Sequence, residues 1–204
     1  NDAPTANAAS GETAEDQSVV IALSGDDIDG DNLTFSLEDS ATNGSVSLDG
    51  SLATYTPDAN YNGDDSFTFS VSDGELSASA SVSLTVNAVN DAPVLATISD
   101  VSFDEDGFAS ISLSASDIDN AELTFSITDG INITASMAGS SDVSFSAPAD
   151  YNGSETFIVT VSDGTLSSSQ SFTVTVNPVN DAPTANAASG ETAEDQSVVI
   201  ALSG

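Results

Sequence analysis

Residues 61–77 read YNGDDSFTFSVSDGELS, and this stretch decides the fold. Within it, Phe67, Phe69 and Val71 alternate with Thr and Ser, so that every second side chain is apolar. A period of two places the apolar side chains on one face of a β-strand and the polar ones on the other. The stretch therefore predicts a strand with one buried face and one face in water.

The same stretch recurs further along the chain, as YNGSETFIVTVSDGTLS at residues 151–167. The tetrapeptide NDAP also recurs, beginning at Asn1, Asn90 and Asn180. These landmarks return in the same order each time and define a tandem unit of ~90 residues. A longer repeat lies over this one, because residues 1–25 recur letter for letter as residues 180–204.

Each unit carries further alternating segments, and Asp49-Gly50 is a hairpin signal between two of them. Turn-rich breaks separate the segments at the spacing typical of a sandwich, and no segment has the pattern of a long amphipathic helix. We therefore predict an all-β protein of tandem immunoglobulin-like sandwiches joined end to end, with seven strands each. The alternating sets are Val19/Ile21/Leu23, Leu33/Phe35/Leu37 and Val82/Leu84/Val86 in the first unit, and Ile111/Leu113, Leu123/Phe125/Ile127, Phe157/Val159/Val161 and Phe172/Val174/Val176 in the second.

The repeats predict the domain boundaries. We expect sandwiches at residues 1–90 and 91–179, followed at 180–204 by the first strands of a further repeat. Two interpretations of residues 180–204 stay open: a continuation cut from a longer fibre, or strands that complete a neighbouring subunit by exchange. Because the first residue is Asn1 and not Met, we also expect a fragment or a processed chain.

The charge of the chain is one-sided: it has 33 Asp and Glu residues, no Lys, Arg or His, and a formal net charge of −33. Self-repulsion on this scale opposes a compact state, and no side chain can neutralise it. Positive charge must come from outside, and clustered carboxylates favour a hard cation such as Ca²⁺.

This composition excludes several classes of function. Without Lys or Arg the chain has no electrostatic footprint for nucleic acid or anionic membrane surfaces. Without His or Cys it has no Ser-His-Asp triad, no usual zinc site and no disulfide. No run of apolar residues approaches the ~20 of a membrane span. A hydrolase working with carboxylates alone stays conceivable, but no pair of carboxylates faces across a cleft, and we predict no enzymatic activity.

The predicted strands carry the carboxylates to the two ends of each sandwich. In the first unit, Glu15, Asp65, Asn90 and Asp91 are expected at one end, and Asp27, Asp29 and Asp73 at the other. In a tandem array, the end of one unit that carries its linker meets the end of the next unit that carries its DxD residues. We therefore expect the junction of the two units to gather one oxygen-rich set: Glu15, Asp65, Asn90, Asp91, Asp117, Asp119 and Asp163.

The chain resembles bacterial cadherin-like repeats, which occur in tandem in large secreted adhesins. The resemblance implies that calcium ligands lie at the matching positions and that the chain is extracellular. The sequence departs from the cadherin pattern in two places. The acidic loop before the strand that follows YNG is reduced to Asp64/Asp65 in the first unit and to Glu155 in the second. The linker begins with Asn87 or Asn177, where animal cadherins carry Asp. The resemblance rests on Glu15 and Glu105, the DxD pairs Asp27/Asp29 and Asp117/Asp119, the VSDG residues Asp73 and Asp163, and the linkers Asn90/Asp91 and Asn180/Asp181.

These observations predict a calcium-rigidified structural spacer of an extracellular fibre or adhesin stalk, with a role in cell-surface attachment, biofilm or filament formation. Its expected partners are neighbouring repeats or subunits, with no nucleic acid and no membrane insertion. The alternatives are a ligand-binding module for a glycan or protein and a filament subunit assembled by donor strands. Only three Tyr and no Trp argue against sugar stacking.

Overall fold

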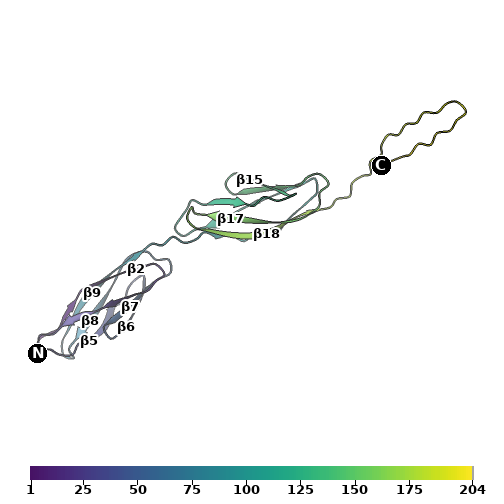
Figure 1. The fold of residues 1–204 in the computed structure, drawn as a ribbon. Helices are drawn as coiled ribbons and strands as arrows, with labels where there is room; N and C mark the ends of the chain where they lie inside the picture. The colour runs from purple at the N-terminus through teal and green to yellow at the C-terminus, as the bar shows by residue number, and fades with distance from the viewer. Residues whose placement is uncertain (204) are drawn as a thin grey trace. The chain divides into compact units, whose positions relative to one another are not determined.

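The computed structural model describes residues 1–203, all of them in strands, turns or irregular segments. The chain divides into two compact units, residues 1–91 and 92–204, each described here by itself. Figure 1 shows both as layered β-structures. Unit 1 contains β1 (Thr5–Asn7), β2 (Ala9–Ala14), β3 (Val19–Ala22), β4 (Ser24–Asp26), β5 (Thr34–Asp39), β6 (Gly44–Asp49), β7 (Leu52–Pro57), β8 (Gly63–Ser72) and β9 (Ser77–Asn87).

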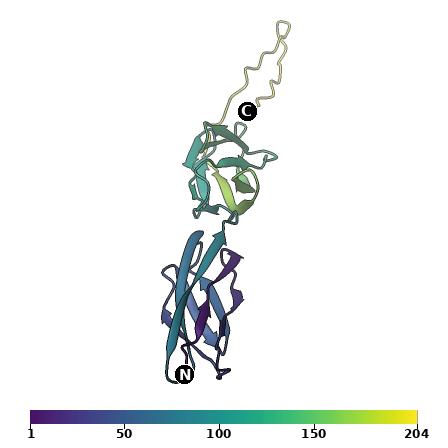
Figure 2. The ribbon, with the colours of Figure 1, turned by 90° about the vertical axis from the view of Figure 1, so that its left-hand side faces the viewer.

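Unit 1 is a sandwich of a four-stranded sheet, ordered β2-β9-β8-β5, and a three-stranded sheet, ordered β3-β7-β6 (Figure 2). The short strands β1 and β4 form a further pair. Because β1 and β2 are two halves of one interrupted strand, and β3 and β4 two halves of the next, the nine elements correspond to seven strands. The predicted all-β, seven-stranded sandwich is confirmed, as is the hairpin at Asp49-Gly50, where β6 turns into β7.

One pairing in unit 1 sets the position of the site described below. Strand β2 runs parallel to β9, from Ala9 opposite Val82 to Ala14 opposite Asn87. The residues that follow both strands therefore leave the sandwich at the same end. The hairpin of β8 and β9 turns back at the opposite end, where Ser72 lies opposite Ser77.

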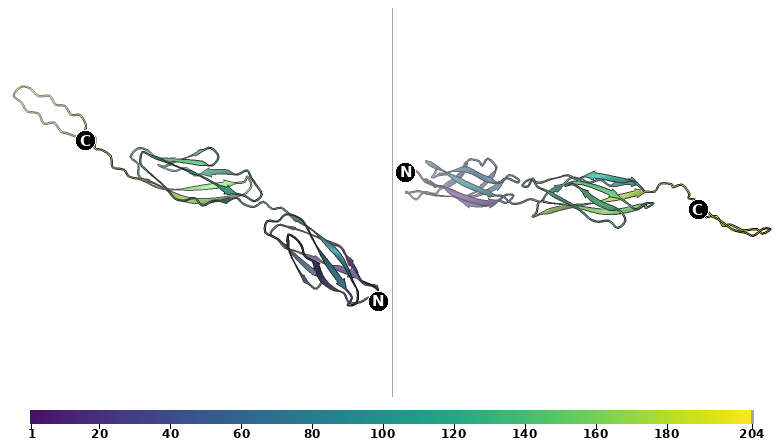
Figure 3. Two further views of the ribbon diagram at one scale, coloured as in Figure 1. Left: turned by 180° about the vertical axis from the view of Figure 1, so that it is seen from behind. Right: turned by 90° about the horizontal axis from the view of Figure 1, so that it is seen from above.

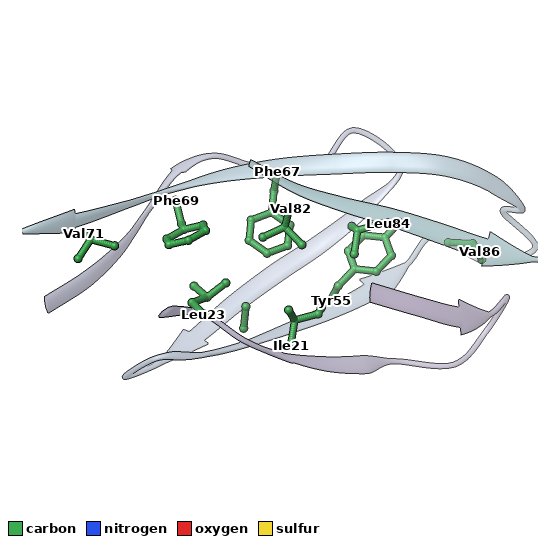
Figure 4. Close-up of a cluster of buried hydrophobic side chains, with 10 residues drawn as sticks. Ile21, Leu23, Tyr55, Phe67, Phe69, Val71, Val82, Leu84 and Val86 are labelled. Carbon is green, nitrogen blue, oxygen red and sulfur yellow. The ribbon is translucent and has the colours of Figure 1, made fainter. Parts of the chain in front are cut away.

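The core of unit 1 lies between the two sheets and follows the period of two. Phe67, Phe69 and Val71 from β8 are at most 1% exposed. Figure 4 shows these side chains pointing toward Ile21 and Tyr55 of the facing sheet. Burial of each such side chain contributes about 1.5–3 kcal/mol. The buried set is Ile21, Leu23, Ala53, Tyr55, Phe67, Phe69, Val71, Val82, Leu84 and Val86.

Unit 2 repeats this plan, with sheets ordered β11-β18-β17-β14 and β12-β16-β15, and a separate pair of β10 and β13 (Figure 3). Its parallel pair, β11 with β18, is shorter and begins at Val101 opposite Val174. The elements are β10 (Val94–Leu95), β11 (Val101–Asp104), β12 (Phe108–Ser112), β13 (Ala115–Ser116), β14 (Thr124–Ile127), β15 (Thr134–Ala138), β16 (Asp142–Ser146), β17 (Gly153–Ser162) and β18 (Ser167–Asn177).

We expect residues 180–204 to be the first strands of a further repeat, and this stays a prediction. None of the described residues after β18 is assigned to a strand, and all of them are exposed. One backbone hydrogen bond, from Asn186 N–H to the Ser203 carbonyl at 3.0 Å, joins the two extended arms of the segment.

Candidate metal centre

Glu15 is the most unusual acidic residue of unit 1. It follows β2 directly, and its backbone N–H donates to the Asn87 carbonyl at 2.9 Å. Its side chain is only 3% exposed. One carboxylate oxygen, Oε1, accepts the Val89 N–H at 2.5 Å. The other, Oε2, is buried and has no hydrogen-bond partner among residues 1–203.

The negative charge of Glu15 is therefore buried, and no hydrogen-bond donor of the described residues stabilises Oε2. Leaving a buried charged group unsatisfied costs about 1–3 kcal/mol or more. In most proteins an Arg or Lys side chain would supply the missing partner, but this chain has neither. Glu15 Oε2 is a carboxylate oxygen, the kind of ligand that calcium prefers. The site therefore fits a hard cation from solution.

The linker of unit 1 lies at the same end as Glu15, as predicted. The contacts of Glu15 with Asn87 and Val89 place its carboxylate beside the start of the segment that leads to Asn90 and Asp91. Asn90 Nδ2 donates to the Asp91 carbonyl at 3.1 Å. Glu15, Asp65, Asn90 and Asp91 were predicted to share one end of the sandwich. Within unit 1, Glu15 lies beside the start of the linker, and Asp65 lies opposite Leu84 near the end of β9.

The equivalent position in unit 2 is Glu105, which is 8% exposed. Its Oε1 accepts the Val179 N–H at 2.5 Å, and its backbone N–H donates to Asn177. Unlike Glu15, it has a second donor, because Asn152 Nδ2 lies 3.4 Å from Oε2. The local fold is the same in both units, since parallel pairing of β11 with β18 repeats that of β2 with β9.

Three further carboxylates meet beside Glu105, from Asp106, Asp150 and Asp181, with one oxygen of each within 4.8 Å of the others. Repulsion from Asp150, with burial and the charges of Glu105 and Asp106, raises the pKa of Asp181. A cation between them would remove this repulsion. Asn180 precedes Asp181 and donates from Nδ2 to its carbonyl at 3.3 Å.

Sequence reasoning found Asn180 and Asp181 but missed Asp106 and Asp150. Both missed residues have positive φ, 63° and 57°, a conformation that Asp tolerates better than most residues. Asp16 and Asn60 hold the same two positions in unit 1, with φ of 59° and 57°. The signal that could have found them is their place directly after each predicted glutamate and directly before each YNG motif.

The DxD loop of unit 1 carries a second acidic cluster. Asp27 Oδ1 accepts the backbone N–H groups of Asp29, Gly30 and Asp31, at 2.8, 3.1 and 3.3 Å. These bonds leave Asp27 Oδ2 buried and without a hydrogen-bond partner in the described chain. Oxygens of Asp27, Asp29 and Asp31 lie within 4.8 Å of one another. Asp31 is a further residue that sequence reasoning did not single out.

The DxD loop of unit 2 has the same local geometry. Asp117 Oδ1 accepts the N–H groups of Asp119 and Asn120, at 2.9 and 2.7 Å. Over the residues that the structure describes, Asp117 Oδ2 is again buried without a hydrogen-bond partner. Both DxD loops therefore use one oxygen of the first Asp to build the loop and turn the other oxygen inward, where a cation fits.

The VSDG aspartates shape the turns between the long hairpin strands. Asp73 Oδ1 accepts the N–H groups of Leu76 and Glu75, at 2.6 and 2.7 Å, and these bonds lower its pKa. Asp163 accepts the equivalent pair from Leu166 and Thr165. In unit 1, Asn1 Nδ2 also reaches Asp73 Oδ2 at 3.0 Å.

Asp29 lies at the end of unit 1 that carries the DxD loop and the turn between β8 and β9. The Asp2 N–H donates to Asp29 Oδ2 at 2.7 Å. Together with the bond from Asn1 to Asp73, this contact gathers Asp27, Asp29 and Asp73 at one end, as predicted. The larger prediction, that Glu15, Asn90 and Asp91 share one site with Asp117, Asp119 and Asp163, joins residues of different units and stays a prediction.

Asp65 and Glu155 have a different role from the one expected of them. Asp65 accepts backbone N–H groups of Thr42, Asn43 and Ser66 and the hydroxyl of Tyr55. Glu155 accepts N–H groups of the segment 131–133 in the same way. Burial works to raise the pKa of both, but the hydrogen bonds outweigh it and lower the pKa. These carboxylates anchor a loop, and they carry no part of the metal proposal below.

The sequence matches a known family of domains. A family model described as "Bacterial Ig domain" matches residues 1–85 and again residues 90–177. The chain belongs to the bacterial Ig domain family. Among curated proteins, none matches its sequence.

Solved structures that resemble this bacterial Ig protein include cadherin ectodomains. Human protocadherin-24 EC1-2 is 18% identical, with a TM-score of 0.53, over 88% of this chain and 100% of that one. The PcdhgB3 EC1-4 structure is 14% identical, with a TM-score of 0.58, over 87% and 50%. At this identity the likeness shows the fold alone.

An enzyme is also among the similar structures. An endo-fucoidan hydrolase from glycoside hydrolase family 107 is 22% identical, with a TM-score of 0.38, and 87% of this chain spans 29% of its length. The comparisons therefore show two tandem bacterial Ig domains with a cadherin-like fold. The described residues include no helix of the length and apolarity that a membrane crossing needs.

Proposed function

We propose that these two bacterial Ig domains are a calcium-rigidified spacer of an extracellular fibre or adhesin stalk. The observation that carries the proposal is Glu15, whose Oε2 is buried without a hydrogen-bond partner in the described chain. Because the chain has no basic side chain, a cation from solution is the positive charge that would compensate it. Such a spacer would hold an adhesive part away from a cell surface, in attachment, biofilm or filament formation.

Four groups of residues would hold the ions. In unit 1 they are Glu15 with Asn90 and Asp91 at one end, and Asp27 with Asp29 and Asp31 at the other. In unit 2 they are Glu105 with Asp106, Asp150 and Asp181, and Asp117 with Asp119. A bound calcium ion supplies positive charge and takes six to eight oxygen ligands, which ties loops of different strands together. Glu15, Asp27 and Asp117 would each contribute a buried carboxylate oxygen that accepts no hydrogen bond from the described residues.

Extracellular calcium suits sites of this kind. Extracellular modules bind calcium with dissociation constants of about 10⁻⁴–10⁻³ M, so the sites would fill outside a cell. Filling them would stiffen the loops that precede each linker, because Glu15 and Glu105 each accept a hydrogen bond from the residue two places before the linker Asp. Stiff linkers are what a spacer requires.

The test compares thermal unfolding in calcium and in chelator at matched ionic strength, with magnesium as the control cation. A ligand present at 100 times its dissociation constant stabilises the folded state by about 2.7 kcal/mol. We expect a clear rise in the unfolding temperature with calcium, a smaller one with magnesium, and a longer persistence length by small-angle scattering. Equal unfolding temperatures in calcium and chelator would contradict the proposal.

A further inference from the structure

Three asparagines of the chain are followed directly by glycine, in the pairs Asn43-Gly44, Asn62-Gly63 and Asn152-Gly153. Asparagine is one of the chemically labile residues of proteins. The backbone nitrogen of the next residue can attack the side-chain amide carbon of the asparagine, and glycine hinders this attack least because it has no Cβ. The structure distinguishes the three pairs by how firmly the backbone of each is held.

The pair Asn43-Gly44 is held on both sides of its peptide bond. The Asn43 N–H donates to Asp65 Oδ2 at 2.8 Å, and the Asn43 carbonyl accepts the Asp58 N–H at 2.8 Å. Gly44 begins β6, where it lies opposite Pro57 of β7. The Gly44 nitrogen can turn toward the Asn43 side chain only after this part of the sandwich opens locally. This pair is therefore an internal reference for the other two.

The other two pairs hold equivalent places, where a loop enters β8 or β17. Asn62 and Asn152 are both exposed and lie just outside the strands. Their glycines are required by the fold, because Gly63 and Gly153 have φ values of 129° and 157°, which strain other residues. A Cβ at Gly153 would also lie 2.6 Å from the hydroxyl oxygen of Tyr151. The fold therefore keeps a glycine after each of these exposed asparagines.

We infer that Asn62 and Asn152 are sites of spontaneous deamidation, whereas Asn43 is protected. At each site the glycine nitrogen forms a bond to the asparagine Cγ. The proton of that nitrogen leaves with the side-chain NH₂ group as ammonia, and a succinimide ring remains. Water then adds to one of the two ring carbonyls and opens the ring to aspartate or isoaspartate. Water is the only other reactant, and the net change replaces a neutral amide with a carboxylate.

At Asn152 the new carboxylate would lie against an existing one. Asn152 Nδ2 is 3.4 Å from Glu105 Oε2, and carboxylate oxygens of Asp106 and Asp150 also meet at this end of unit 2. Deamidation therefore removes a hydrogen-bond donor from Glu105 and adds a like charge beside it, which destabilises the folded unit. A bound cation would offset this loss. That last consequence rests on the calcium proposal, whereas the deamidation itself does not.

At Asn62 the new carboxylate would also join an acidic end. The Asn60 N–H donates to Asp16 Oδ1 at 3.0 Å, so the loop that leads to Asn62 lies beside the residue that follows Glu15. Both sandwiches would therefore gain negative charge with age, at the end that carries the buried glutamate.

The first test measures the deamidation itself and needs no metal ion. The full folded chain is stored in chelator at neutral pH, and chymotrypsin, which cuts after Tyr61 and Tyr151, then releases peptides for mass spectrometry. We expect Asn62 and Asn152 to convert several times faster than Asn43, and all three to convert at similar rates in urea-unfolded chain. Equal rates at the three sites of the folded chain, or no conversion of Asn62 and Asn152, would overturn the inference.

The second test measures the consequence at Glu105. Asn152→Asp carries the product, and Asn152→Gln is the matched control, because it keeps an amide whose larger ring closes far more slowly. In chelator we expect Asn152→Asp to unfold at a lower temperature than Asn152→Gln, and calcium to restore most of the difference. A difference that calcium does not reduce would contradict the calcium proposal and not the deamidation, which the peptide masses decide alone. Equal unfolding temperatures in chelator would overturn the inferred repulsion with Glu105.

Discussion

Glu15 and Glu105 hold equivalent positions but differ by one hydrogen bond. Glu105 Oε2 receives the amide of Asn152 at 3.4 Å, whereas Glu15 Oε2 receives no hydrogen bond from the described residues. A carboxylate that is buried without a second donor is the more unstable of the two when no cation is bound. Unit 1 should therefore depend on calcium more strongly than unit 2.

Replacement of Glu15 by Gln tests this dependence directly. Glu15→Gln removes the buried charge, so we expect it to be neutral or stabilising in chelator and to remove about 1–3 kcal/mol of the calcium-dependent stabilisation. Calorimetry with and without calcium measures both effects. Glu38→Gln, at an exposed position in β5, is the matched control and should keep the full calcium response. A variant Glu15→Gln with that same full response would contradict the assignment.

Asp65 makes a second prediction, which concerns pH. Its pKa is lower in the folded chain than its ordinary value of 3.8. A depressed carboxyl pKa adds stability above the unfolded-state pKa, and this stability is lost as pH falls through the folded-state value. Asp65→Asn should therefore destabilise unit 1 by about 2 kcal/mol at pH 7, because hydrogen bonds to a charged acceptor are lost. This cost should shrink as pH falls below 3.8 and through the folded-state pKa.

Chemical denaturation at several pH values measures this difference. The neighbouring variant Asp64→Asn is the control, because Asp64 is exposed and its carboxylate accepts only a long hydrogen bond, from Thr85 Oγ1 at 3.3 Å. If the cost of Asp65→Asn did not fall as the pH is lowered, the charge would have no part in anchoring the loop.

At the scale of elements, the two sandwiches use different residues for one joint between their sheets. In unit 1, Tyr55 of β7 donates its hydroxyl to Asp65 of β8 at 3.0 Å. Gly44 leaves room for the ring, because a Cβ there would lie 2.6 Å from it. In unit 2 the pairings of β15, β16 and β17 place Ile133, Phe145 and Glu155 at these positions. Phe145 has no hydroxyl to donate, so Glu155 is held by the backbone N–H groups of residues 131–133 without a tyrosine partner at that position.

The Tyr55 hydroxyl should contribute to the stability of unit 1, whereas unit 2 has Phe145 at this position and no such contribution. Tyr55→Phe should lower the stability of unit 1 by about 1 kcal/mol, the contribution of a typical hydrogen bond. A double-mutant cycle with Asp65→Asn should show coupling between the two residues, because they are in contact. Additive effects in the cycle would show that the hydroxyl does not support the carboxylate.

Most of the fold was predictable at this scale, and much of the joint was not. Alternation in residues 67–71 and 157–161 predicts strands because each strand has one wet face. Asp65 and Glu155 were predicted as ligands because a sequence shows that an acid follows a turn, but not which oxygens its backbone neighbours already occupy. Asp106 and Asp150 were missed because their proximity to Asp181 depends on three separate loops.

At the scale of the whole molecule, a net charge of −33 acts on every element at once. Simple salt screens such repulsion, with a Debye length of about 10 Å at 0.1 M and 3 Å at 1 M. In chelator we therefore expect NaCl to raise the unfolding temperature gradually. Calcium at constant ionic strength should raise it further and saturate, because specific sites fill. A calcium effect reproduced by NaCl of equal ionic strength would indicate screening alone.

The parallel pairing of β2 with β9 has a mechanical consequence. The strands run in the same direction, and tension applied through Asn1 and Asp91 draws them in opposite directions along their length. The six residue pairs are then loaded in shear and must rupture together, whereas an antiparallel edge would unzip one bond after another. Unit 2 has only four such pairs, from Val101 to Asp104. A stalk built from these units would yield first at the second sandwich, and single-molecule pulling should record two separate rupture forces.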